Sequence, residues 1–509
     1  MIVKNEGKFL NACLQSVQQF VDEIVIVDTG STDTTIAIAQ QYNAKIFHFA
    51  WNGNFSDARN ESLRHCSGDW ILFLDADERL ERNDVNALRL LLREPHADGY
   101  ELPVASLKHI QHRTQQTTSY QTRLFRNDER YRFRYRIHEM ITPAILEHNG
   151  VVERISVVIH HDGYDCSEEE MQQKMLRNLP ALIIDAEEYP DNLFLQKRLA
   201  QTHLVLGNAH ESFSILHKTI QRIEQQHLEK IHPLSCGYLY VLYADVLMQQ
   251  KKYSEAEAAA LQSLQHVPQQ NFAHYVLSQL YEAQARYTDA ITHINQILPS
   301  QRDFQFGSAQ QQAMAEEDVF PLKQDILHQR AVLYRKMKNF EAEKNDLAEV
   351  VRLAPHFTMG LFDYASALAR DGSLKDALQF LQKAQTLEPK NASIYHQRGN
   401  IFFKLERYTE AYNNLKSAFT YGANDDALLL LLIRLSRELK KGAEAVPYCD
   451  CYLQRHSAAA DILMELVQLL IQNNNVHYAR TVIERSLPSL PDGAIRATIH
   501  EIYQKLYTV

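Results

Sequence analysis

The sequence lacks the features of a membrane-spanning or exported protein. None of its apolar runs approaches the roughly 18 residues that a membrane-spanning helix needs, and residues 1–6 contain no hydrophobic signal-peptide core. Cysteine is scarce, and the spacing of the six residues matches no metal-ligand pattern: Cys13, Cys66, Cys166, Cys236, Cys449 and Cys451. We therefore expect reduced thiols in a cytoplasmic protein without a membrane span.

An excess of positive charge is also missing. Lys and Arg number 53 against 63 Asp and Glu, which gives a net charge of −10. This balance argues against a general nucleic-acid binder, so no nucleic-acid partner is expected. The length of 509 residues exceeds one ordinary hydrophobic core and predicts two or more domains.

The stretch at residues 69–78 carries the strongest chemical signal. Its apolar run, residues 70–74, reads as a buried strand of a parallel sheet, and it ends in Asp75, Asp77 and Glu78. Three acids within four residues repel one another unless a cation lies beside them. Ligands bind where parallel strands end, and an Asp-x-Asp there can hold a divalent cation that bridges nucleotide phosphates. The alternative is a solvated acidic turn.

Residues 1–100 alternate between strand and helix patterns. Strands are expected at 1–3, 23–28 and 45–49, and helices at 7–20, 34–42 and 54–66. Such alternation predicts an α/β domain with a doubly wound, mainly parallel sheet. Because the first strand pattern begins at Met1, either that strand is short or the natural chain starts upstream.

Seven short motifs occur in a fixed order along the first 180 or so residues. They are MIVKNE (1–6), VDTGSTD (27–33), ARN (58–60), LDADE (74–78), RLFRN (123–127), IHE (137–139) and HDGY (161–164). Together they resemble the motifs of family 2 glycosyltransferases, in particular the subgroup that includes peptide S-glycosyltransferases acting on glycopeptide bacteriocins. The resemblance implies a GT-A fold, a nucleotide-sugar donor, a divalent metal and inversion at the anomeric carbon.

The resemblance also implies residues that bind the donor. Asn5 and Glu6 would line the nucleotide pocket, and Asp28 would lie against the nucleobase, although a turn residue is the alternative for Asp28. The guanidinium of Arg59 would bind the diphosphate through two hydrogen bonds, and a surface ion pair is the alternative for this residue. Asp75 would contact the ribose or a metal-bound water.

The metal ligands and the general base are implied in the same way. Asp77 would bind the metal directly, together with His161 or its neighbour His160, and the alternative for His161 is a structural hydrogen bond. An imidazole ligand suits Mn²⁺ better than Mg²⁺. We expect Glu139 to be the base that takes the acceptor proton, with Asp57 and Glu78 as further candidates.

Six arginines form a basic cluster: Arg123, Arg126, Arg130, Arg132, Arg134 and Arg136. From 129 to 136 basic and aromatic residues alternate, as in a strand with one solvated face. An anionic contact or nucleic-acid binding are the rival interpretations of this cluster.

The second half of the chain is repetitive. Tyr253 and Tyr287 lie 34 residues apart, and a small residue follows three positions later at Ala256 and Ala290. This period resembles tetratricopeptide repeats, whose groove typically binds an extended peptide or another protein. The predicted organisation is a glycosyltransferase domain at 1–165, a connecting helix at 166–192, about eight repeats forming an α-solenoid at 193–490 with an insert at 300–323, and a helix at 491–509.

The sequence thus predicts an inverting, metal-dependent enzyme that moves a sugar from a nucleotide-sugar, a UDP-sugar by expectation, to a peptide or protein acceptor presented by the repeats. The cofactor would be Mn²⁺ or Mg²⁺. A non-catalytic repeat scaffold with a degenerate transferase domain is one alternative, and a transferase for a glycan or lipid acceptor is another. The sugar, the acceptor and a homo-oligomeric state stay open.

Overall fold

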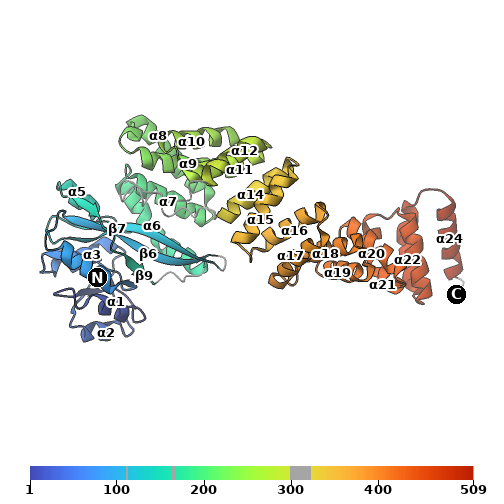
Figure 1. The fold of residues 1–509 in the computed structure, drawn as a ribbon, viewed down its shortest axis with the longest axis horizontal. Helices are drawn as coiled ribbons and strands as arrows, with labels where there is room; N and C mark the ends of the chain where they lie inside the picture. Colours follow the sequence, from blue (N-terminus) through green and yellow to red (C-terminus); the bar gives the residue numbers. More distant parts are fainter. Residues whose placement is uncertain (111–112, 163–167, 299–322, 508–509) are drawn as a thin grey trace. The chain divides into compact units, whose positions relative to one another are not determined.

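The computed structural model describes residues 1–110, 113–162, 168–298 and 323–507. The chain divides into two compact units, Met1–Phe320 and Pro321–Val509. Figure 1 shows the α/β region at the N-terminal end of the first unit and helical pairs in the rest of the chain. The expected fold class, α/β followed by all-α, is therefore confirmed. No helix among the described residues is long and apolar enough to cross a membrane.

The strands of the first unit form two sheets. The first sheet has three parallel strands in the order β1 (Ile2–Val3), β2 (Val25–Asp28) and β3 (Lys45–His48). The second sheet is mixed and has the order β4-β7-β6-β9-β5, with β8 paired to β6. Its strands are β4 (Trp70–Leu72), β5 (Glu78–Leu80), β6 (Gly99–Ile110), β7 (Arg113–Arg126), β8 (Val152–Arg154) and β9 (Ile159–His161).

Six helices accompany the strands: α1 (Leu10–Val17), α2 (Thr35–Gln41), α3 (Phe55–Arg64), α4 (Arg82–Leu91), α5 (Thr142–Glu147) and α6 (Glu168–Glu188). The first three helices form where the apolar spacing predicts them, although each is shorter than its pattern. Helix α3 begins after Asn54, whose side chain accepts a hydrogen bond from the Asp57 backbone N–H as an N-cap.

The strand that precedes the acidic motif differs from the expectation of a parallel strand. Strand β4 pairs antiparallel with β7, with Ile71 opposite Phe125, and the Phe73 N–H donates to the Arg123 carbonyl just beyond the strand. Burial on both faces is as expected, because Ile71 and Phe73 pack in one hydrophobic cluster and Leu74 in another. The long hairpin of β6 and β7 supplies this partner from over 50 residues away, and a local pattern does not reveal such a pairing.

The expected strand at 129–136 is not formed. The described residues of this segment make a single bridge, between Arg134 and Met140. Tyr131 and Phe133 are buried as the alternation predicts. Tyr135, however, has φ 71°, and this left-handed conformation ends an extended run.

Within the described residues, the α-helices after α6 form eight pairs, followed by one further helix. These are α7 (Leu193–Val205) with α8 (Ala209–Gln226), α9 (Pro233–Gln249) with α10 (Tyr253–His266), α11 (Asn271–Ala283) with α12 (Tyr287–Ile297), α14 (Lys323–Lys336) with α15 (Phe340–Leu353), α16 (Thr358–Arg370) with α17 (Leu374–Leu387), α18 (Ala392–Lys404) with α19 (Tyr408–Thr420), α20 (Asp426–Glu438) with α21 (Gly442–Arg455), and α22 (Ala460–Gln472) with α23 (Val476–Ser486). Helix α24 (Ala494–Tyr507) follows them. The expected insert lies outside the described residues except for Lys323.

The helix pairs share a turn conformation and a buried position where the two helices meet. Each turn inside a pair contains a residue in the left-handed conformation: Gly207, Lys251, Ala285, Lys338, Gly372, Glu406, Lys440 and Asn474. The small residues Ala256 and Ala290 of the repeat pattern are fully buried, and so are Ala377 and Ala411 at the corresponding positions of later pairs. At the corresponding position Glu343 is also fully buried, and there it pairs with Arg335 and Arg370.

Helix α6 shares a hydrophobic cluster with both the α/β region and the first repeats. This cluster comprises Ile137, Leu182, Ala186, Phe194, Leu195, Leu199 and Tyr238. Ile137 belongs to the loop before α5, whereas Phe194 begins the first repeat helix. The connecting helix therefore packs against both the α/β region and the first repeat helices. The domain boundaries at 165 and 192 stay a prediction.

Candidate active site

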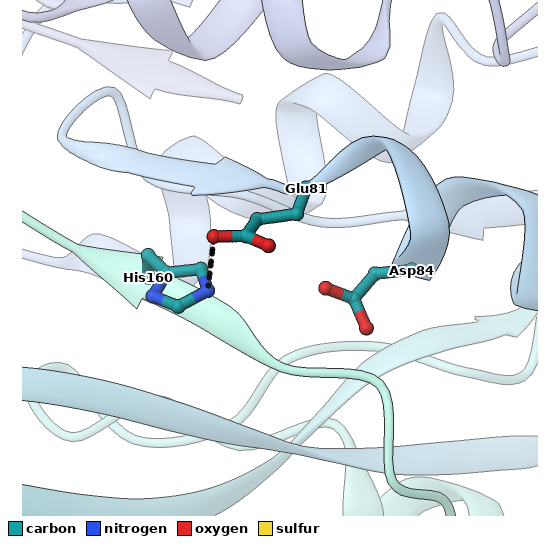
Figure 2. A group of neighbouring side chains, drawn as sticks. All are labelled: Glu81, Asp84 and His160. Atoms are coloured by element: carbon teal, nitrogen blue, oxygen red, sulfur yellow. Dashed lines mark ion pairs between the residues drawn. The ribbon is translucent and has the colours of Figure 1, made fainter.

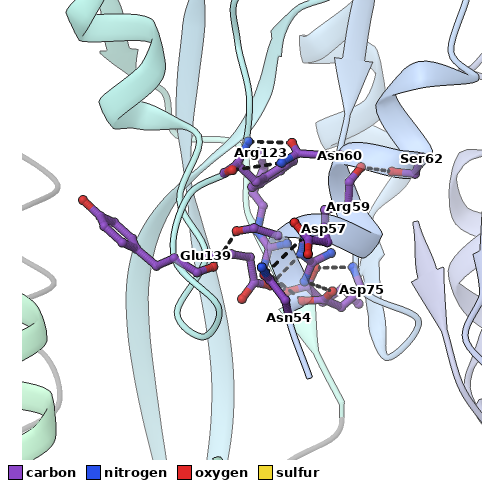
Figure 3. Close-up of polar contacts among 12 residues, drawn as sticks. Asn54, Asp57, Arg59, Asn60, Ser62, Asp75, Arg123 and Glu139 are labelled. Atoms are coloured by element: carbon purple, nitrogen blue, oxygen red, sulfur yellow. Dashed lines mark hydrogen bonds and ion pairs between the residues drawn. The ribbon is translucent and has the colours of Figure 1, made fainter. Parts of the chain in front are cut away.

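Asp75 is held at the end of β4 by two arginines. Its Oδ1 lies 2.9 Å from Nη2 of Arg59, and its Oδ2 lies 3.4 Å from Nη2 of Arg123. Burial opposes ionisation of this carboxyl group, but the charges of the two guanidinium groups outweigh it. They hold the pKa of Asp75 well below its usual range. Figure 3 shows this cluster between α3 and the neighbouring strands.

Arg59 connects Asp75 with the predicted base. Its Nε donates to Oε1 of Glu139 at 2.5 Å (Figure 3). Its guanidinium lies 4.0 Å from the centre of the Phe73 ring. The residue is only 6% exposed. Its buried Nη1 has no hydrogen-bond partner among the described residues, so its N–H groups are unsatisfied within the protein.

The sequence analysis named Arg123 only as part of the basic cluster and missed its contacts with the acidic motif. Its Nη2 also lies 2.7 Å from Oε1 of Glu78, and both side chains are almost fully buried. Oε2 of Glu78 in turn accepts the backbone N–H of Asp75. Burial raises the pKa of Glu78 although Arg123 opposes the shift. The sequence did hold one signal for this pair. Arg123 directly precedes the apolar residues Leu124 and Phe125 of a buried strand, and a buried arginine requires an anionic partner.

The structure brings the two predicted metal ligands together. Nε2 of His161 lies 3.1 Å from Oδ2 of Asp77. Ligand bonds of about 2.1 Å at right angles put neighbouring ligand atoms about 3 Å apart, so this pair fits one octahedral divalent cation. Burial disfavours the charged imidazole, but the hydrogen bond to Asp77 and its charge outweigh burial and raise the pKa of His161.

His160, the alternative ligand, belongs to a different cluster. Successive side chains of a strand point to opposite faces, and Nε2 of His160 lies 3.5 Å from Oε1 of Glu81. Figure 2 shows these two residues with Asp84, and one ligand atom from each lies within 4.8 Å of the others. Of the two histidines, His161 is therefore the one beside the Asp-x-Asp motif.

The charge of Asp77 also acts on Glu6, a predicted pocket residue. Burial raises the pKa of Glu6, and the charges of Asp77, Asp75 and Asp33 add to that shift. This concentration of negative charge favours a cation between them.

Asn5 and Asp28 shape the loop that follows β2. Oδ1 of Asn5 accepts the N–H of Thr32 at 2.8 Å. Asp28 is 4% exposed and accepts the N–H groups of Gly30 and Ser31 at 3.2 and 3.0 Å. Burial opposes ionisation of Asp28, but hydrogen bonds, led by those from Ser31, outweigh it and lower its pKa. Both residues thus hold the loop after β2 in one conformation.

The candidate bases differ in their surroundings. In the described structure no hydrogen bond is made to Oε2 of Glu139, whose side chain is 14% exposed. Asp57 is exposed, and its Oδ2 accepts a hydrogen bond from the Asn52 side chain at 2.8 Å. Glu78 is 1% exposed and paired with Arg123, so it cannot reach an acceptor without rearrangement.

The arginines of the basic cluster form ion pairs within the protein. The pairs are Arg126 with Asp98, Arg130 with Asp128, Arg134 with Glu147, and Arg136 with both Asp185 and Glu188. Arg132 donates to the backbone carbonyls of Asp128 and Tyr131. These partners neutralise the cluster and leave little free charge for an anionic polymer.

Sequence comparisons assign both parts of the chain. Residues 1–150 match the profile of glycosyl transferase family 2. Residues 242–303 and 328–392 match a tetratricopeptide repeat profile. The N-terminal part of the chain is therefore a family 2 glycosyltransferase domain, and tetratricopeptide repeats follow it.

Three curated relatives illustrate the range of the similarity. A TPR repeat-containing protein of Synechococcus elongatus is 32% identical over 50% of this chain and 61% of its own length. Glycosyltransferase SunS of Bacillus subtilis is 28% identical over 48% of this chain and 61% of its own. The lipopolysaccharide core biosynthesis glycosyltransferase LpsC of Rhizobium meliloti is 37% identical over 20% of this chain and 35% of its own. The chain thus spans less than two thirds of each of these relatives.

Proposed function

We propose that the protein is an inverting, metal-dependent glycosyltransferase that moves a sugar from a UDP-sugar to a peptide or protein acceptor. The observation that supports this proposal most strongly is the pair of Asp77 and His161 at 3.1 Å. The five cysteines in the described residues are free thiols, which agrees with a cytoplasmic location where nucleotide-sugars are available.

Asp77 and His161 would hold Mn²⁺ or Mg²⁺. When bound, the cation supplies positive charge beside the donor diphosphate. Arg59 and Arg123 provide little of that charge, because their guanidinium groups already form ion pairs with Asp75, Glu78 and Glu139. Nη1 of Arg59 and both Nε and Nη1 of Arg123 have no hydrogen-bond partner in the described structure, and we assign Nη1 of Arg59 to a diphosphate oxygen.

The loop held by Asn5 and Asp28 would border the nucleobase, and Glu6 would line the same pocket. Asp75 faces the ribose or a water molecule near the cation. Because Arg59 and Arg123 fix both oxygens of Asp75, this carboxylate keeps its orientation before the donor binds.

Glu139 is the proposed general base. Its Oε1 is held by Arg59, and Oε2 would take the proton from the acceptor as the nucleophile attacks the anomeric carbon. The bond between that carbon and the UDP oxygen breaks as the new bond forms, so the configuration inverts. The hydrogen bond from Arg59 positions this base, and Asp57 is the alternative.

The repeats would present the acceptor. An array of helix pairs forms an extended surface that suits an extended peptide. The relatives include a glycosyltransferase whose name states no acceptor and a lipopolysaccharide core biosynthesis enzyme. The peptide acceptor is therefore our inference from the repeats and from the motif resemblance.

Calorimetric titration with UDP tests the donor and metal assignments together. We expect Mn²⁺ to increase UDP affinity at least tenfold for the wild-type chain and to have no effect on Asp77→Ala. Circular dichroism checks that the variant is folded. Equal UDP affinity with and without Mn²⁺ in the wild-type chain would contradict the metal-dependent donor site.

A further inference from the structure

The loop that carries Glu139 has an uncommon backbone conformation. Tyr135 and His138 adopt φ 71° and 56°, in the left-handed region that residues other than glycine rarely occupy. Two such residues within four positions persist only where the surrounding structure imposes them. The contacts that impose this conformation therefore also determine where the Glu139 carboxylate lies.

Asp185 of helix α6 makes the central contact with this loop. Its Oδ2 accepts the backbone N–H groups of Arg136 and Ile137 at 2.6 and 3.2 Å, and its Oδ1 pairs with the Arg136 side chain at 2.8 Å. The residue is fully buried. A buried carboxylate that accepts two consecutive N–H groups fixes the peptide plane between the two left-handed residues.

The first repeat helix adds a second contact from the same side. Nδ2 of Asn192 donates to the hydroxyl of Tyr135 at 2.8 Å, while Oδ1 of Asn192 caps α7 by accepting the N–H of Phe194 at 3.1 Å. Ile137 packs in the cluster that α6 and α7 share.

Helix α3 holds the loop from the other side. Ser56 Oγ donates to the Tyr135 carbonyl at 2.5 Å, the Phe55 N–H donates to the Arg136 carbonyl at 2.9 Å, and Arg59 binds Glu139. The loop is therefore fixed between α3, which belongs to the transferase domain, and the helices that lead into the repeats.

We propose that Asp185 is a positioning residue for catalysis, and that the connecting helix is thus a working part of the active site. This proposal rests on the proposed function, with Glu139 as the base. Asp185 acts by holding residues 135–138 so that Glu139 meets the acceptor proton. Displacement of a reacting group by about 1 Å can slow a reaction about 10²-fold.

Hydrolysis of a UDP-sugar in the presence of Mn²⁺ measures this effect without knowledge of the acceptor, since water then replaces it. The full chain is assayed with UDP-glucose, UDP-galactose and UDP-N-acetylglucosamine, and the fastest substrate is kept. Asp185→Ala should lower kcat about 10²-fold and leave the Kd for UDP with Mn²⁺ unchanged. Asp185→Asn keeps an oxygen acceptor for the loop and should recover at least tenfold of that loss.

Glu188→Gln is the matched control. Glu188 lies on the same helix and pairs with the same Arg136 side chain, but it is half exposed and makes no contact with the loop backbone. Its replacement should leave kcat within twofold of wild type, because exposed ion pairs contribute little.

A double-mutant cycle separates positioning from general destabilisation. If Asp185 acts through Glu139, then Asp185→Ala should cause no further loss of kcat in the Glu139→Gln background. The positioning role would be overturned if the fold-losses of kcat in the two single variants multiplied in the double variant, or if both Asp185 variants bound UDP more weakly. Either result would leave the proposed function intact. Failure of the wild-type chain to hydrolyse any of the three donors would contradict the proposed function itself, and this proposal with it.

Discussion

At the scale of single residues, Asp75 joins the two sides of the candidate site. One carboxylate oxygen faces Arg59, which also holds Glu139, and the other faces Arg123, which also holds Glu78. Both guanidinium groups lie over the Phe73 ring, at 4.0 and 4.2 Å from its centre. Phe73 therefore makes cation–π contacts with both guanidinium groups, which an apolar position in a strand pattern does not suggest by itself.

The neighbouring histidines provide a matched pair for testing the metal ligand. His161→Ala should weaken Mn²⁺ binding at least tenfold, because it removes a ligand beside Asp77. His160→Ala removes an imidazole from the other face, beside Glu81, and should leave the affinity within twofold. Titration with Mn²⁺ in the presence of UDP gives both values. The opposite ranking of the two variants would refute the choice of His161.

Arg123 should be important for stability as well as for the site. Arg123→Ala leaves Glu78 buried without its cation, and removal of one partner from a buried pair costs about 3–5 kcal/mol. Arg126→Ala, on the same strand, breaks the more exposed pair with Asp98 and should cost about 1 kcal/mol or less. Thermal unfolding should show this difference, and equal Tm values for the two variants would argue against a structural role for the Arg123 pair.

Much of the site could be predicted from residue patterns, because its acids follow strands and carry recognisable motifs. The sequence placed Asp75, Asp77 and His161 in one site, and the structure brings Asp77 and His161 within 3.1 Å. The contacts of Arg123 were missed because it lies inside a long strand, and its neighbours Asp75 and Glu78 come from more than 40 residues earlier. The roles of these residues stay predictions until they are measured.

At the scale of secondary-structure elements, glycine has different roles in the turns of the repeats and at their helix–helix contacts. Gly372 has φ 85° and open space around its α-carbon, so Gly372→Ala should cost about 1–2 kcal/mol from backbone strain alone. Gly399 is in a helix, where an added Cβ would lie 2.5 Å from Leu415 Cγ and 3.3 Å from the Ala411 carbonyl. Gly399→Ala should therefore cost about 1–3 kcal/mol through overpacking.

Hydrogen exchange can distinguish these two effects. The change at Gly399 should lower protection in α18 and α19, whereas the change at Gly372 should lower it in α16 and α17. Loss of protection in the same helices for both variants would contradict the expected locality of repeat interactions.

Local patterns predicted burial better than they predicted strands. The alternation at 129–136 correctly indicated that Tyr131 and Phe133 are buried, yet the segment follows an irregular path. That path depends on hydrogen bonds to Asp185 and Ser56, which lie about 50 and 80 residues away in sequence. A period of two residues cannot distinguish a strand from an irregular extended loop with the same inward-facing side chains.

At the scale of the whole molecule, the 34-residue period predicted the repeats, but it could not show that the connecting helix and first repeats share a core with the transferase domain. A chain cut after residue 190 would lose Phe194, Leu195, Leu199 and Tyr238 from the cluster that contains Ile137. We therefore expect this fragment to be unstable. A chain cut after residue 320, where the first compact unit ends, should stay folded and retain UDP-sugar hydrolysis.

The longer fragment also tests what the later repeats do. If they help to present the acceptor, the fragment should hydrolyse the donor at the wild-type rate but transfer sugar to the native acceptor at least tenfold less efficiently, because remote binding energy serves orientation. Undiminished transfer would assign the later repeats to docking or oligomerisation. Loss of UDP binding would show instead that the fragment is not properly folded.

The most direct test of the proposed enzyme is to follow UDP release from a panel of UDP-sugars with the full chain, first with EDTA and then with excess Mn²⁺. We predict that at least one donor is hydrolysed, that EDTA abolishes the reaction and that Mn²⁺ restores it. No consumption of any donor with Mn²⁺ present, or consumption that EDTA does not affect, would contradict a metal-dependent glycosyltransferase built on Asp77 and His161.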